Sequence, residues 1–237
     1  MFEREKYILE KLILKANLET LLRGVNYFIA GGACTSVFSG SQVNDLDIYF
    51  FTEKDCGQAQ DQLVIDSSIF RTENAWSFKN NGVKVQYICK LVGSESEILK
   101  NFDFTVNECA YNPRIKDFTM NKDYFIYDLC SKRLRYNING KYPIASLWRV
   151  NKYIKKGFSL PAIESIKLAL RINDLNITTY KDLKEQLEGI DTLFLKDLTD
   201  KFLENPDKEF QFNEALELMN KVLEEKLTLI GDEDEDI

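Results

Sequence analysis

Two acidic residues interrupt the apolar stretch DLDIYFF at positions 45–51. Asp45 and Asp47 stand two residues apart, so in a β-strand both side chains would leave the same face. The alternate residues would face the core on the opposite side: Leu46, Ile48 and Phe50. Two carboxylates this close repel each other unless a cation lies between them, and their hard oxygen atoms suit Mg²⁺ or Mn²⁺. The pair indicates a metal site for phosphate chemistry, in which one ion activates a hydroxyl and another holds a triphosphate.

A pair of glycines precedes the aspartates, at the end of the apolar stretch VNYFIAGG. Gly31 and Gly32 allow the backbone to turn sharply and to approach a ligand closely. If the following ACTSVF begins a helix, its first N–H groups favour phosphate, and the hydroxyl of Ser36 is placed to add a contact. The glycines alone are equally typical of an ordinary strand–turn–helix connection. Together with the aspartates they favour a nucleotide site.

Histidine is absent from the 237 residues. This absence excludes Ser-His-Asp and Cys-His nucleophiles and every histidine-ligated metal site. Any catalysis must therefore depend on carboxylates, lysine, tyrosine or a metal held by oxygen atoms.

The net charge of −7 argues against a surface covered by nucleic acid. Residues 129–163 nevertheless contain no acid, and they carry a run of basic residues: Lys132, Arg133, Arg135, Lys141, Arg149, Lys152, Lys155 and Lys156. We expect this basic segment either to receive phosphates or to form a solvated helix face.

The five cysteines are scattered and form no CxxC pair, which predicts reduced, mostly buried thiols: Cys34, Cys56, Cys89, Cys109 and Cys130. No apolar run approaches the roughly 20 residues that span a bilayer. The N-terminal MFEREKYILEKLILK mixes acids and bases in an amphipathic helical pattern, unlike a signal peptide. We therefore expect a cytoplasmic protein with no membrane partner.

The candidate site must be positioned by an α+β fold. We predict a head of mixed β-sheet and flanking helices over residues 1–142, a helical C-terminal domain over 143–230 and an acidic disordered tail over 231–237. The expected elements include a helix over 2–23, strands over 25–30 and 45–51, a hairpin turn at 80–82 and a short helix opened by a capping box of Ser94 and Glu97. A C-terminal helical stripe is expected to be core: Phe212, Ala215, Leu216, Met219, Val222 and Leu223.

Three motifs in order resemble those of a known superfamily. FIAGG, followed after twelve residues by DLDIYF, resembles the signature of the DNA polymerase β-like nucleotidyltransferases. DFTVNECAY at 103–111 and LWRVNKYIKKGFSL at 147–160 are similar to segments of CCA-adding tRNA nucleotidyltransferases and bacterial poly(A) polymerases. The short chain, sparse in glycine and proline, also resembles the compact relatives found in phages and mobile elements.

The resemblance implies a role for each matching residue. Gly31, Gly32 and Ser36 would line the triphosphate, and Asp45 and Asp47 would ligate Mg²⁺ or Mn²⁺ and be catalytic. Asp103 and Asn107 would approach the ribose or phosphates, with Asp103 a further catalytic candidate. Arg149 and Lys152 would contact nucleotide or substrate.

The sequence also departs from the family pattern. Thr35 and Ser36 stand where the family has an arginine and an aspartate, and Asn101 and Phe102 replace two arginines. A third carboxylate should fall in the strand VKVQYICKL, which offers Gln86 instead. Either two aspartates suffice, or Asp103 is the third, or activity is weakened. No convincing segment for selecting the incoming base is present, so CCA addition is not implied.

The favoured function is transfer of a nucleoside monophosphate from an NTP, with ATP or CTP favoured, to a hydroxyl at an RNA or tRNA 3′ end. Two alternatives stay open. The first is a non-catalytic nucleotide- or RNA-binding module, and the second is a toxin–antitoxin type nucleotidyltransferase that modifies a tRNA or a protein.

Overall fold

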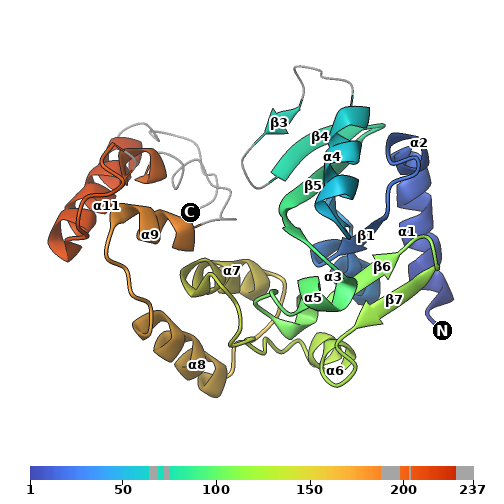
Figure 1. Cartoon of the computed structure of the whole chain (residues 1–237). Helices are drawn as coiled ribbons and strands as arrows, with labels where there is room; N and C mark the ends of the chain where they lie inside the picture. The colour runs from blue at the N-terminus through green and yellow to red at the C-terminus, as the bar shows by residue number, and fades with distance from the viewer. Residues whose placement is uncertain (64–68, 72–74, 188–197, 203, 228–237) are drawn as a thin grey trace. The chain divides into compact units, whose positions relative to one another are not determined.

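A computed structural model describes residues 1–63, 69–71, 75–187, 198–202 and 204–227 (Figure 1). The chain divides into two compact units, which are described separately. The first comprises residues 1–140 and 157–164, and the second comprises 141–156 and the described residues from 165 onward. The predicted tail over 231–237 lies outside the described residues.

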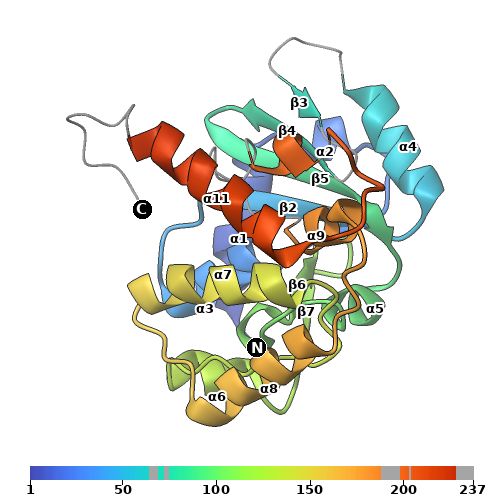
Figure 2. The same ribbon diagram turned by 90° about the vertical axis from the view of Figure 1, so that its left-hand side faces the viewer.

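The first unit is built on a seven-stranded mixed sheet with the order β3-β4-β5-β2-β1-β6-β7. The labelled strands follow this order in Figure 1, where β2 carries no label, and in Figure 2, where β1 carries none. The strands are β1 (Tyr27–Ala30), β2 (Asp45–Phe50), β3 (Phe70–Arg71), β4 (Ala75–Asn80), β5 (Val83–Val92), β6 (Cys109–Asn112) and β7 (Asp117–Met120). Within this sheet, β2 and β5 run parallel and the other neighbouring pairs are antiparallel. The helices of the unit are α1 (Glu3–Lys15), α2 (Leu18–Leu21), α3 (Gly32–Ser39), α4 (Glu53–Gln62), α5 (Glu95–Leu99), η1 (Thr105–Asn107) and α6 (Phe125–Cys130).

The two faces of the sheet are covered differently. One face carries fully buried side chains of the central strands and packs against α3 and α4: Ile29, Leu46, Ile48, Phe50, Val85 and Tyr87. On the other face, Ile98 and Leu99 of α5 cluster with Phe28 and Tyr49. The N-terminal half of β2 lies beyond this second cluster, so its polar face stays open to solvent in part.

Turn and cap residues set the ends of several elements as the sequence predicts. Asn81 and Gly82, both with positive φ, make the two-residue turn between β4 and β5, in which Asn80 pairs with Val83. The capping box of Ser94 and Glu97 at α5 is confirmed. The single helix expected over 2–23 is wrong, because Asn17 adopts a left-handed conformation and separates α1 from α2.

The second unit is helical, as expected. It contains α7 (Pro143–Lys155), the greater part of α8 (Ala162–Asn173), α9 (Tyr180–Gln186) and α11 (Phe212–Leu227). Its core gathers Tyr180, Leu183, Leu198, Phe202, Ala215 and Val222. The predicted stripe on α11 is partly wrong, since Phe212 is 70% and Leu216 45% exposed. Three other members of the predicted stripe, Ala215, Met219 and Val222, do pack in the core, together with Leu218, and the side chain of Leu223 lies outside the described part of the structure.

The expectation of five reduced thiols is also corrected. Cys56 of α4 and Cys89 of β5 form a disulfide, and Cys130 is exposed. Scattered spacing gave no sign of this pair, because only the packing of α4 on β5 brings together two cysteines that are 33 residues apart. Within the described part of the chain, no helix is both long and apolar enough to cross a membrane.

The two faces of β2 should respond differently to substitution. Leu46→Ala removes a fully buried side chain and should lower the free energy of unfolding by about 3 kcal/mol. Asp45→Asn, on the half-open face of the same strand, should change it by less than about 1 kcal/mol. Urea unfolding followed by circular dichroism measures both values. Equal losses in the two variants would contradict the assigned orientation of β2.

Candidate functional site

Asp45 and Asp47 lie at the start of β2 on the same face of the strand, as the sequence predicts. Both are half-buried, whereas the core-facing residues of the strand are fully buried: Leu46, Ile48 and Phe50. Both carboxylates are therefore partly exposed, so a cation can reach them from solvent and their charge is only partly desolvated.

The glycine turn lies at the same end of the sheet as the aspartates. β1 and β2 are antiparallel with Ile29 opposite Ile48, so β1 ends at Ala30, directly before Gly31, at the point where β2 begins. Gly31 has a φ of 75°, which favours glycine, and an added Cβ would be in van der Waals contact with the Phe102 ring at 3.4 Å. A Cβ on Gly32, the first residue of α3, would meet no atom within 4 Å. The open side of the turn is therefore at Gly32.

The neighbouring strand β5 places two polar residues beside the aspartates. The parallel register pairs Asp45 with Lys84 and Asp47 with Gln86. The Lys84 ammonium lies 3.8 Å from Oδ2 of Asp45. The Gln86 amide donates a 2.9 Å hydrogen bond to Ser77 Oγ on β4. Gln86 thus stands in register with Asp47, where the expected third carboxylate is missing.

Asp103 does not complete a three-carboxylate site. It is buried in the segment between α5 and η1, where its carbonyl accepts a 2.7 Å hydrogen bond from the Asn137 amide. In the portion of the chain that the structure describes, no three acidic or cysteine side chains are close enough together to hold a metal ion. The metal-ligating candidates are therefore the pair Asp45 and Asp47.

The predicted nucleotide contact Asn107 is buried in η1 and joined to α3 through Thr35. The Thr35 hydroxyl donates to the carbonyl of Val106 at 2.6 Å and lies 3.1 Å from Oδ1 of Asn107. Ser36, the next residue on α3, is also buried, and its carbonyl accepts a 2.9 Å bond from the Ser41 amide. Thr35, which stands where the family pattern has arginine, therefore fastens α3 to η1.

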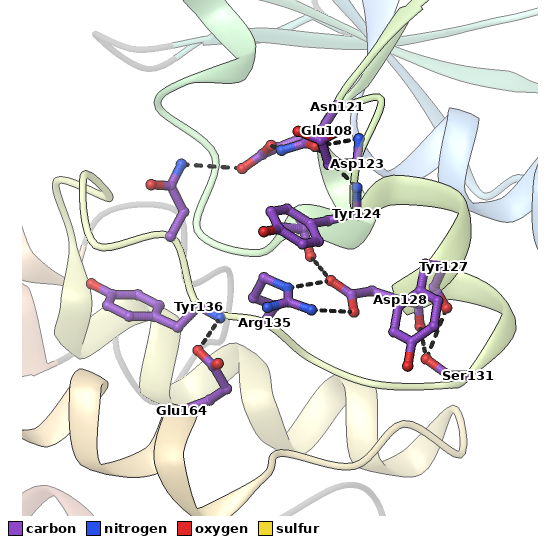
Figure 3. Close-up of polar contacts among 12 residues, drawn as sticks. Glu108, Asn121, Asp123, Tyr124, Tyr127, Asp128, Ser131, Arg135, Tyr136 and Glu164 are labelled. Atoms are coloured by element: carbon purple, nitrogen blue, oxygen red, sulfur yellow. Dashed lines mark hydrogen bonds and ion pairs between the residues drawn. The ribbon is translucent and has the colours of Figure 1, made fainter.

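Asp128 forms buried polar contacts with Thr105 of η1 and with Arg135. It is fully buried in α6, accepts a 2.7 Å hydrogen bond from the Thr105 hydroxyl and pairs with both Nε and one terminal nitrogen of Arg135 (Figure 3). The pairing with Asp128 raises the pKa of Arg135. The expectation that the basic segment receives phosphates is therefore wrong for Arg135, whose guanidinium also stacks 4.0 Å from the Tyr124 ring.

Glu108 forms a second buried polar contact next to η1. Its carboxylate accepts hydrogen bonds from the side chains of Asn121 and Asn137 (Figure 3). Burial raises the pKa of Glu108, and the two amide donors offset part of this shift. The Asn137 side chain also donates to the carbonyls of Lys100 and Phe102, at 3.1 and 3.0 Å. Asp128 lies outside the three motifs, and Glu108 lies within DFTVNECAY at a position to which no role was assigned, so sequence reasoning missed both.

Arg149 and Lys152 lie on α7 in the second unit, so the geometry of the first unit does not include them. Arg149 is half-buried and Lys152 is exposed.

The fold of the chain is similar to that of CCA-adding enzymes. The chain matches a Thermotoga maritima CCA-adding enzyme complexed with tRNA at a TM-score of 0.50 and 16% identity, over 91% of this chain and 51% of that one. It matches a CCA-adding enzyme in complex with ATP at a TM-score of 0.51 and 17% identity, over 91% of this chain and 50% of that one. The predicted α+β fold class is confirmed by this likeness, which concerns the fold alone.

The chain belongs to the Gabija anti-defense 2 family, whose model matches residues 3–132. A relative described as Gabija anti-defense 2, from Bacillus phage SPbetaL7, is 32% identical over 232 residues. The match covers 94% of this chain and 55% of the relative, so the chain spans about half of the relative's length. The motif resemblance thus identified the fold, whereas no motif pointed to this family.

Removing the buried acid should destabilise the first unit. Asp128→Asn leaves the Arg135 guanidinium without its carboxylate and should lower the free energy of unfolding by about 3 kcal/mol. Asp123→Asn makes the same chemical change at an exposed position and should cost less than about 0.5 kcal/mol. Chemical unfolding measures both, and an equal cost would contradict a structural role for the Asp128–Arg135 pair.

The raised pKa of Glu108 predicts a pH dependence of stability. The folded state favours the protonated carboxyl, so this contribution is fully present below the unfolded pKa of about 4.3 and is lost as pH rises through the folded pKa. The stability of wild type relative to Glu108→Gln should therefore fall as the pH rises above about 4. Glu185→Gln, at an exposed position, should keep the wild-type pH profile. Parallel profiles of wild type and Glu108→Gln would contradict the shift.

Proposed function

We propose that the chain is a metal-dependent nucleotidyltransferase that moves a nucleoside monophosphate from an NTP to a hydroxyl, at the 3′ end of an RNA. One observation carries the proposal. Asp45 and Asp47 lie at the same end of the paired strands β1 and β2 as Gly32, where the glycine turn is open. Two carboxylates and a helix that begins at a glycine turn are suited to a cation and a phosphate chain, respectively.

The donor set fits a hard divalent cation such as Mg²⁺ or Mn²⁺, because both aspartates offer oxygen atoms from one strand face. When bound there, the cation would neutralise charge on the triphosphate and on the attacking oxygen. The N–H groups at the start of α3 and the Ser36 hydroxyl would hold phosphate oxygens. Asn107, whose Oδ1 lies 3.1 Å from the Thr35 hydroxyl, would approach the ribose or the phosphates. Asp103 would do the same.

The reaction would be an in-line substitution at the α-phosphorus. The acceptor oxygen forms a bond to this phosphorus, while the bond to the oxygen that bridges to the β-phosphate breaks. Pyrophosphate leaves with the bonding electrons, and the acceptor proton is released to solvent. The chain's contribution would be alignment and charge stabilisation.

The names of related proteins support the choice of partners. The two fold neighbours are described with ATP and with tRNA, which supports an NTP donor and an RNA acceptor. Arg149 and Lys152 would contact RNA phosphates. The phage relative is named for anti-defense against Gabija, so we propose that nucleotidyl transfer by this chain serves to counter that defense.

A non-catalytic nucleotide-binding module is the second candidate. The Gln86 side chain favours it, because a neutral amide, already bonded to Ser77, stands in register with Asp47 where a third carboxylate was expected. Both candidates predict nucleotide binding, and they differ in whether label is transferred.

A transfer assay separates the two candidates. Purified protein with Mn²⁺ and each α-labelled NTP in turn is incubated with total RNA and with cell lysate, and label is followed in RNA and in protein. The Asp45→Asn/Asp47→Asn variant should lose at least roughly a hundredfold of the RNA labelling, because the cation loses both charged ligands. Asp123→Asn, an exposed change of the same kind, should keep wild-type activity.

Other outcomes count against the proposal in distinct ways. Undiminished labelling by the double variant would refute the role of the aspartates. Label in one protein band in place of RNA would indicate a protein-modifying transferase. Binding of NTP without any transfer would favour the non-catalytic module. Plaque counts on bacteria carrying a Gabija defense, with wild type or double variant expressed, test whether the site serves anti-defense.

A further inference from the structure

We propose that Asp45 and Asp47 bind a single divalent cation and that the Lys84 ammonium takes the place of a second one. This inference rests on the proposed function and specifies the metal content of the same site. It follows from the strand that lies beside the two aspartates.

The β2–β5 register fixes Lys84 next to Asp45. The two residues are paired in the parallel ladder, so their side chains leave the same face of the sheet. The ammonium lies 3.8 Å from Oδ2 of Asp45 while both side chains keep access to solvent, with 52% and 35% exposure. A second cation bound about 2.1 Å from this carboxylate oxygen would lie within about 6 Å of a like charge, which disfavours it.

The charges of the paired residues on β2 and β5 match one cation better than two. Asp45 and Asp47 contribute two negative charges, Lys84 contributes one positive charge, and Gln86 is neutral. Among the described residues, no third acid joins the pair to share a second ion. Two carboxylates with oxygen donors on one strand face can hold one ion, while the further ligands of that ion come from water and phosphate.

Lys84 is also suited to contact the triphosphate. A lysine ammonium is a compact charge on a flexible four-carbon stem with three donors. The weak, solvent-exposed pairing with Asp45 holds Lys84 near the site without fixing it there. On nucleotide binding the ammonium would move to phosphate oxygens and favour the departing pyrophosphate, as a second cation does in two-metal sites.

Counting bound Mn²⁺ tests the inference without measuring activity. Mn²⁺ is titrated into the intact chain, with and without a non-hydrolysable ATP analogue, and free Mn²⁺ is followed by electron paramagnetic resonance. The wild type should bind one Mn²⁺ per chain. Lys84→Met should bind Mn²⁺ roughly tenfold more tightly without nucleotide, because a like charge is removed, and should bind the ATP analogue more weakly.

Lys79→Met is the matched control. Lys79 pairs with Lys84 across β4 and β5, so it is an exposed lysine on the same face but one strand further from Asp45. Two strand spacings, about 10 Å, exceed the screening length of about 8 Å at physiological salt, so this variant should bind Mn²⁺ as the wild type does. The double variant Lys84→Met/Gln86→Asp restores a third carboxylate and should bind two Mn²⁺ per chain in the presence of the analogue.

Three results would overturn the inference. Two Mn²⁺ bound to wild type with nucleotide would refute a single-cation site while leaving the proposed function intact. Equal Mn²⁺ affinity of wild type and Lys84→Met, or an equal gain in Lys79→Met, would remove the specific role of Lys84. Absence of both Mn²⁺ and nucleotide binding in wild type would refute the proposed function together with the inference.

Discussion

The parallel pairing of β2 with β5 is the constraint on which the candidate site depends. Its register buries Leu46 and Ile48 against the core, and the same period-two alternation leaves Asp45 and Asp47 on the open face. A slip of one residue would bury both carboxylates and expose the apolar residues, so hydrophobic burial itself orients the acids. The pairing also determines which residues of β5 accompany them, and these are a lysine and an amide in place of a carboxylate.

Buried polar contacts hold residues 102–107, the segment that is joined to α3 through Thr35. Asp128 holds Thr105 and Arg135, Thr35 fastens α3 to η1, and Asn137 fixes the backbone before η1. The Asp128–Arg135 pair joins residues seven apart, whereas the other contacts join residues at least 23 apart in sequence, so together they fix the positions of Asp103 and Asn107 relative to the glycine turn. The polar residues of the DFTVN segment therefore have structural partners of their own, in addition to any role toward a ligand.

Local rules predicted much of the fold from sequence. Alternation in DLDIYFF, the Asn81–Gly82 turn and the Ser94 capping box each act within a few residues, and the structure contains all three. The features that sequence reasoning missed depend on tertiary packing. Cys56 lies next to Cys89 only because helix α4 packs on β5. Arg135 differs from its basic neighbours only because the folded chain brings Asp128 into contact with it. The exposed Phe212 on α11 similarly shows that an apolar pattern alone does not decide which helix face is buried.

The chain combines a fold similar to that of CCA-adding enzymes with membership of a family named for anti-defense. The proposed function requires that Asp45 and Asp47 hold a cation that binds an NTP. The most direct test is a crystal structure of the chain with Mn²⁺ and a non-hydrolysable ATP analogue, with anomalous scattering used to locate the metal. We expect one Mn²⁺ peak about 2.1 Å from a carboxylate oxygen of each aspartate, with the phosphates at the Gly32 end of α3. A nucleotide bound elsewhere, or no metal at the aspartates, would contradict it.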